Sequence, residues 1–178
     1  LMDIYQALSA SPSGKIAVKL STGEPGSNYL RTELIGELVE SLEGTIVECN
    51  TAYGGSRANT AMHYQVAEEH GYTAIADVDI MDEEGSITLP VTGGDNLTEN
   101  YVGAHFANYD YYVVLSHFKG HSMAGFGGAI KNISIGIASS EGKSHIHSGG
   151  TGGSMWGGSQ DAFLESMAEA GKSVVDYL

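Results

Sequence analysis

Histidine and lysine side chains gather in one stretch of the chain, residues 117–156. This stretch holds four of the seven histidines and three lysines, at positions 119, 131 and 143. Glycine is dense there as well, because 12 of the 40 residues from 119 to 158 are glycine, against 25 in the whole chain of 178. Glycine packs no side chain and costs backbone entropy, so this density is typical of backbone that bends sharply or approaches a ligand. The stretch therefore predicts a binding or catalytic site.

The histidines suggest a nitrogen-rich metal site for nickel, iron or zinc. His117 and His121 have the spacing of two ligands on one helix face, although the glycines around them disfavour a helix. His145 and His147 would lie on one side of an extended segment. We predict His121, His145 and His147 as metal ligands, with His117 as a further candidate. The alternative is that single histidines only bond to backbone carbonyls.

The run GFGGAIK is similar to a loop that cradles an anion at the start of a helix. Gly125, Gly127 and Gly128 would present backbone N–H groups to a cofactor, while the missing Gly-Lys-Ser/Thr ending argues against an ATPase. Lys131 lies among isoleucines, where desolvation would lower its pKa and favour nucleophilic chemistry. The alternative is a lysine whose amine reaches water. We predict Lys131 and His121 as catalytic residues.

Two glycine-rich loops follow expected strands. Residues 50–60 follow the strand at 45–49, and residues 117–128 follow the strand at 111–116. Ligands of open α/β sheets bind beyond the carboxyl ends of the strands. We therefore expect the loops 50–60 and 117–158 to form one crevice, with Ser56 and Arg57 among its cofactor-binding residues.

The order of elements predicts a single α/β domain over residues 1–178, with a mixed, mostly parallel sheet and crossover helices. The strand at 111–116 is continuous and β-branched, so we expect it to be central and buried on both faces. Both ends lie inside helical patterns, which suggests a fragment of a longer protein. Expected strands cover 15–20, 45–49, 73–78, 86–91, 99–106 and 111–116. Expected helices cover 1–10, 34–42 capped by Thr32, 61–70, a start within 127–139, and 160–178. Residues 140–158 are expected to be loop.

Composition excludes several classes of function. The net charge of −14 would repel nucleic acid and anionic lipid. No run of 18 apolar residues predicts a membrane span and no signal peptide is recognisable, so we expect a cytoplasmic location. Cys49 is the only cysteine, which excludes an internal disulfide, and we expect a buried, inert thiol. His63 and His70 are expected at the surface.

The run LSHFKGHSMAGFGGAIKNISIGIASSEGKSHIHS resembles the central motif of the domain of unknown function 362 family. The resemblance extends through VKLSTGEPGSNYL and ECNTAYGGSRANT to the last helix, so it covers nearly the whole chain. Members are often described as uncharacterised iron–sulfur-centre proteins, a description that implies cysteine clusters in an added segment. With Cys49 alone, this chain cannot hold an iron–sulfur cluster.

A more distant similarity is to nickel-pincer lactate racemases, whose motif resembles HSMAGFGGAIK followed by a later His-Ser pair. This resemblance implies an acid/base role for His121, a tether to the pincer cofactor for Lys131, and nickel coordination by His147. The racemases carry a second acid/base histidine in a Gly-x-His-Arg element, where this chain has Ser56. Serine cannot replace imidazole as a proton shuttle near neutral pH, which puts racemisation in doubt.

Three hypotheses for the function stay open. The crevice could bind a small molecule or a metal-containing cofactor, with a role linked to redox chemistry. Alternatively, the chain is a non-catalytic docking module whose acidic surface attracts a basic redox partner and whose crevice binds only an anion. A nickel-pincer-type isomerase is the third. The sequence leaves open whether the protein is an enzyme.

Overall fold

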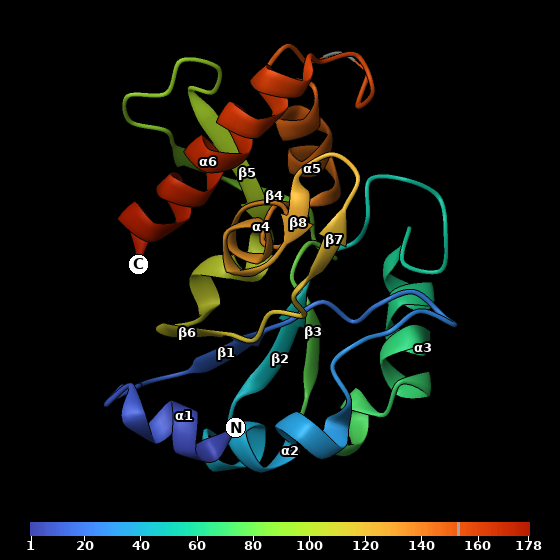
Figure 1. Ribbon diagram of the computed structural model, residues 1–178, viewed down its shortest axis with the longest axis vertical. Coiled ribbons are helices and arrows are strands. Elements are labelled where there is room, and N and C mark those ends of the chain that lie inside the picture. The colour runs from blue at the N-terminus through green and yellow to red at the C-terminus, as the bar shows by residue number, and fades with distance from the viewer. Residues whose placement is uncertain (153) are drawn as a thin grey trace.

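The centre of the protein is a four-stranded parallel sheet. The computed structural model describes residues 1–152 and 154–178, and its strands run in the order β3-β2-β1-β6 (Figure 1). All three strand pairs are parallel, and two antiparallel hairpins lie outside the sheet. The expected single α/β domain is therefore confirmed. The strands of the sheet are β1 (Ile16–Lys19), β2 (Thr45–Glu48), β3 (Val78–Ile80) and β6 (Tyr111–Val114).

One face of the sheet is covered by α1 (Met2–Ala7) and α2 (Thr32–Ser41), which lie below it in Figure 1. The apolar residues of α2 recur at helical spacing, so that Ile35, Leu38 and Val39 are buried together. They pack against the apolar residues of β1 and β2. Burial of each such side chain contributes roughly 1.5–3 kcal/mol.

The opposite face is covered by helices from the second half of the chain, which lie above the sheet in Figure 1. Their apolar residues form the core with one of the antiparallel hairpins.

No helix in the described part of the chain is long and apolar enough to span a bilayer. Helix α3 (Thr60–Glu69) lies beside β3. The helices of the second half are α4 (Ala129–Ser134), α5 (Ser140–His147) and α6 (Gln160–Tyr177). The two hairpins are β4 (Ser86–Pro90) with β5 (Glu99–Gly103) and β7 (Lys119–His121) with β8 (Gly125–Gly127), and short 3₁₀ helices lie at Tyr72–Ala74 and Ala104–Asn108.

Three strand predictions were wrong in whole or in part. The strand expected at 99–106 ends at Gly103, and a 3₁₀ helix follows it. β6 lies at the edge of the sheet, and all four of its residues are only half-buried, because among the described strands it pairs with β1 alone. Residues 73–78 were expected to be a strand, but the chain forms a 3₁₀ helix there and the strand begins only at Val78. The helix α2 begins at Thr32 itself and receives no side-chain cap.

The prediction of a loop over 140–158 was wrong for its first eight residues, which form α5. Ser139 caps this helix, because its side chain accepts a hydrogen bond from the backbone N–H of Gly142. The buried residues recur at helical spacing, with Lys143 and His147 on one face. Glycines and polar residues hid this pattern in the sequence.

Two histidines that we expected at the surface, His63 and His70, are buried or half-buried. His63 is fully buried, with its Nε2 2.8 Å from Thr22 Oγ1 and its Nδ1 3.3 Å from Asn50 Oδ1. Burial lowers the pKa of His63 to about 4, so its ring is neutral at physiological pH. His70 is half-buried and stacks on Tyr29 at a ring-centroid distance of 3.8 Å. Both rings therefore fix the loop after β1 against α3.

A buried ion pair joins the carboxyl ends of the two central strands. Lys19 is fully buried, and its Nζ lies 2.8 Å from Glu48 Oε1. Burial alone would raise the pKa of Glu48, but Lys19, Lys143 and Arg57 outweigh burial and hold that pKa at about 2. Glu48 is therefore ionised throughout the physiological range.

We expect Glu48→Gln to lower the free energy of unfolding at pH 7 by about 3–5 kcal/mol, because it leaves the Lys19 ammonium buried without a counter-charge. The pKa of Glu48 falls from 4.5 to about 2 on folding, so its stabilising contribution is present above about pH 4.5 and lost as the pH falls toward 2. The difference between wild type and variant should therefore narrow over that window.

Urea unfolding measured from pH 7 to pH 2 checks this expectation. The matched control is Glu40→Gln on the exposed side of α2, which should change the free energy of unfolding by less than about 0.5 kcal/mol. A difference between Glu48→Gln and wild type that stays constant over the whole pH range would contradict the role of the pair.

Candidate functional site

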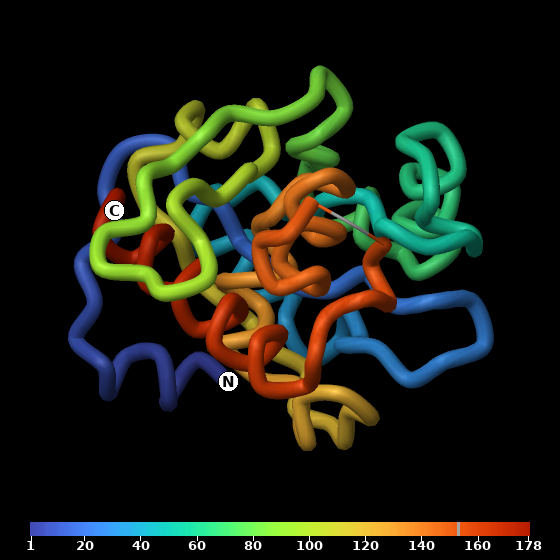
Figure 2. Tube along the Cα trace, turned by 90° about the horizontal axis from the view of Figure 1, so that it is seen from above, coloured from blue at the N-terminus to red at the C-terminus, as the bar shows by residue number. Residues whose placement is uncertain are grey.

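A cavity of about 350 Å³ lies at the carboxyl ends of β1, β2 and β6. Its walls come from the loop after β2, the connection after β6, the hairpin β7 (Lys119–His121) and β8 (Gly125–Gly127), α4 and α5. The segment before α6 also contributes, and Figure 2 shows it on the same side of the molecule as the loops after β1 and β2. The loops 50–60 and 117–158, which we expected to meet, therefore line one cavity.

Positive charge is concentrated in this cavity. Of the eight lysines and arginines in the chain, Arg57, Lys119, Lys131 and Lys143 line it. Arg57 and Lys143 are buried, with 8% and 7% of their surface exposed. Glu48 is the only carboxylate among the described lining residues. The cavity is thus a cationic site within an acidic protein.

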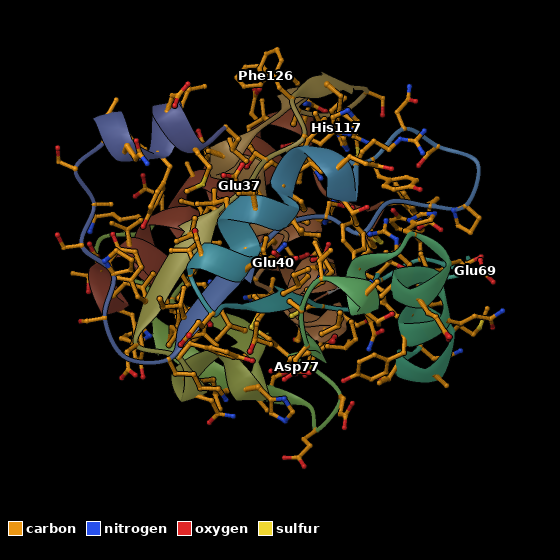
Figure 3. All side chains as sticks on the ribbon, turned by 90° about the horizontal axis from the view of Figure 1, so that it is seen from below. Glu37, Glu40, Glu69, Asp77, His117 and Phe126 are labelled. Carbon is orange, nitrogen blue, oxygen red and sulfur yellow. The ribbon has the colours of Figure 1, made fainter. Side chains whose placement is uncertain are left out.

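Negative charge is spread over other surfaces of the molecule. Figure 3 shows Glu37 and Glu40 on α2, Glu69 on α3 and Asp77 before β3, all exposed to solvent. In the same view, His117 lies at one edge of the molecule, away from Asp77. Because surface carboxylates repel anions in solution, the cationic cavity is the place where an anion is favoured.

Arg57 is fixed by two carboxylates. Its Nε donates to Glu24 Oε1 at 2.8 Å, and its Nη1 lies 3.7 Å from Glu48 Oε2. Burial alone would lower the pKa of Arg57, but Glu48 and Glu24 raise it, so the guanidinium is always charged. Its neighbour Ser56, also predicted to bind a cofactor, does not line the cavity.

Lys131 lies in α4, directly after the glycines Gly127 and Gly128 that line the cavity beside it. Within the described residues, its amine makes no hydrogen bond and no ion pair. Burial, and then the charges of Lys119 and Lys143, lower the pKa of Lys131 to about 8. About half of the amines are therefore neutral near pH 8, and a neutral amine is a nucleophile.

Three of the four predicted site histidines line the cavity: His117, His121 and His147. The Nδ1 of His121 accepts hydrogen bonds from the N–H groups of Met123 at 3.2 Å and Ala124 at 3.1 Å. In the neutral ring, the proton therefore lies on Nε2. Burial, and then the positive charge of Lys131, lower the pKa of His121.

His147 has the opposite tautomer. Its Nδ1 lies 2.7 Å from the carbonyl oxygen of Lys143, to which it donates, so Nε2 keeps a free lone pair. The ring stacks on Phe163 at a centroid distance of 4.7 Å, and burial lowers its pKa. His147 Nε2 can thus accept a proton or a metal ion, while His121 Nε2–H can donate.

The structure does not bring His145 to the cavity. Because residues 145 and 147 lie on a helix and not in an extended segment, their side chains point in different directions. His145 packs instead against Tyr101, at a ring-centroid distance of 5.0 Å. Gly125, with a φ of 71°, begins β8 directly after the turn of the hairpin and also lies outside the cavity lining.

The donor set fits a ligand held by amines and imidazoles better than a bare metal ion. Among residues 1–152 and 154–178, no group of three His, Cys, Asp or Glu side chains is close enough to hold a metal. Cys49 lines the cavity, but its Sγ donates to Ile137 O at 3.3 Å and burial raises its pKa to about 12. Such a thiol remains protonated near neutral pH.

Several lining residues escaped prediction. Lys143 could have been found from the spacing of four to His147 after the serine cap, had the helix been recognised. Glu48 lies at the end of an apolar strand and Asn132 lies within an apolar run, so the sequence around neither residue indicates a site. Tyr53 and Trp156, both exposed at the cavity, carry no local motif.

Residues 16–178 match the family described as Domain of unknown function (DUF362), so the chain belongs to this family. The match covers the whole sheet, the cavity and α6, and leaves out only the N-terminal segment with α1. No curated protein and no solved structure matches the chain. Family membership agrees with the resemblance carried by the motif around Lys131, and the function has to be argued from the cavity.

Competitive labelling with a trace of acetic anhydride, followed by peptide mass spectrometry, checks the state of Lys131. We expect its acetylation to reach half of the maximum near pH 8, because burial and neighbouring cations favour the neutral amine. The exposed Lys172 on α6 serves as an internal reference for the reagent. A half-maximum near the ordinary lysine value of about 10.4 would contradict a desolvated amine.

Proposed function

We propose that the cavity binds an anionic small molecule, which Lys131, Lys143 and Arg57 hold. One observation carries this proposal: four of the eight cationic side chains of a protein with net charge −14 line a cavity with one carboxylate. The volume of about 350 Å³ suits a small molecule.

Burial strengthens the argument, because a desolvated cation attracts an anion more strongly than a hydrated one does. Lys143 donates one hydrogen bond, to the carbonyl oxygen of Ala138 at 2.6 Å, and no carboxylate lies within 4.0 Å of it in the described residues. Leaving an ammonium in this state is costly without a counter-charge. An anion in the cavity would supply it.

Titration of the protein with citrate, phosphate and glycerol at constant ionic strength tests the proposal. We expect both anions to raise the unfolding temperature, because binding at a hundred times the Kd stabilises the native state by about 2.7 kcal/mol. Uncharged glycerol should have no saturable effect. Lys131→Met should weaken the effect of the anions.

The control for the loss of one positive charge is Lys172→Met, which changes an exposed lysine on α6. This variant should keep the wild-type response. Equal weakening by Lys172→Met and Lys131→Met would mean that the anions act through overall charge and not through the cavity.

A metal-containing cofactor is the second candidate, and the convergence of Lys131, His121 and His147 favours it. The partly neutral amine of Lys131 could form a covalent tether, and the free Nε2 of His147 could bind a metal. A cofactor of the nickel-pincer type would supply the metal centre itself. Because Ser56 does not line the cavity, a second acid/base group is not supplied from that position.

Intact mass and metal content, measured on protein purified from its own host without a tag or chelator, test the second candidate. We expect a mass adduct on Lys131 together with roughly one equivalent of a transition metal. His147→Ala should keep the adduct and lose the metal, whereas His145→Ala, which changes a ring outside the cavity, should keep both. A preparation with neither adduct nor metal would contradict the metal-containing cofactor and leave the anionic small molecule as the remaining candidate.

A further inference from the structure

The cations around the cavity outnumber the carboxylates that neutralise them. Lys19 is paired with Glu48 at 2.8 Å, and Arg57 with Glu24 at 2.8 Å and Glu48 at 3.7 Å. These three ion pairs use both carboxylates, Glu24 and Glu48. Lys19 and Arg57 are therefore paired, and neither carboxylate is left for the remaining lysines of the cavity.

Among the described residues, Lys131, Lys143 and the more exposed Lys119 are the lysines of the cavity without a carboxylate partner. Lys131 lines the cavity from α4 and Lys143 from α5, and neither makes an ion pair with a described residue. The charge of Lys143 is among the influences that lower the pKa of Lys131, so the two ammonium groups repel each other in the absence of a ligand. A ligand with one negative charge would leave one of these two ammonium groups without a counter-charge.

We propose that the ligand of this cavity is a dianion, a dicarboxylate or a phosphate monoester, whose two negative charges are matched by Lys131 and Lys143. This inference rests on the proposed anion-binding function and specifies the charge of the ligand. The shared chemistry is the double negative charge within a volume of about 350 Å³. Arg57 is less available to the ligand, since two carboxylates already hold it.

The charge around the two lysines comes from every neighbouring element. Among the lining residues that the structure describes, Glu48 on β2 is the only carboxylate, and it is already shared between Lys19 and Arg57. Lys119 on β7 adds further positive charge at the exposed side of the cavity. A net positive field therefore extends from the buried end to the entrance, and it discriminates between anions by their charge.

Calorimetric titration of the full chain at pH 7 with matched pairs of ligands tests the inference. Succinate is compared with succinamate, its singly charged amide, and methyl phosphate with singly charged dimethyl phosphate. We expect the dianion of at least one pair to bind roughly tenfold or more tightly than its monoanion. A preference confined to the first pair identifies a dicarboxylate site, and one confined to the second identifies a phosphate monoester site.

Variants assign the preference to the two lysines. Lys143→Met and, independently, Lys131→Met should each remove the preference for the dianion, so that failure of one variant to fold leaves the other as the test. Lys172→Met, with the same change of charge, should retain it. Equal affinity of the wild type for both members of each pair would overturn the dianion inference and leave the anion site standing. Failure of all four ligands to bind would overturn the anion site as well.

Discussion

The buried ammonium of Lys19 is the constraint on which the rest of the site depends. Its three acceptors are the carbonyl oxygen of Leu20 at 2.7 Å, Glu48 Oε1 at 2.8 Å and Asn132 Oδ1 at 2.7 Å. Asn132 in turn donates to the carbonyl oxygens of Lys19 and Leu115, both at 3.3 Å. The network therefore joins β1, β2, the end of β6 and α4, and it fixes Lys131, one residue before Asn132, at the cavity.

Satisfying this network restricts the residues around it. A side chain at Gly136 would bring its Cβ to 2.7 Å from Lys19 Nζ, so the turn after α4 has no room for one. Part of the glycine density that indicates a ligand site in the sequence thus has a structural cause. Gly142 gives a second case, because a Cβ there would collide with the carbonyl oxygen of Tyr101. Glycine content alone therefore overstates how much backbone faces a ligand.

The sequence predicted the parts of the fold that repeat a simple pattern. Helix α2 and the strands β1 and β2 follow directly from the spacing of apolar residues, and the position of the site follows from loops after parallel strands. Burial on both faces was wrong for β6, since an apolar run does not show how many neighbours a strand has. Helix α5 was missed because its helical face is made of Gly142, Lys143, Ile146 and His147, of which only one is a conventional core residue. That single error separated Lys143 from the predicted site and added His145 to it.

The lining of the cavity reaches from Ser21 to Trp156, so most of the chain must be folded before the binding surface exists. A partly folded chain offers scattered lysines but no enclosed positive field. A ligand that needs this field binds only the folded domain, and it therefore shifts the folding equilibrium away from partly folded chains. Binding of the proposed anion would therefore be coupled to folding, so that a higher anion concentration would raise the free energy of unfolding of the whole domain.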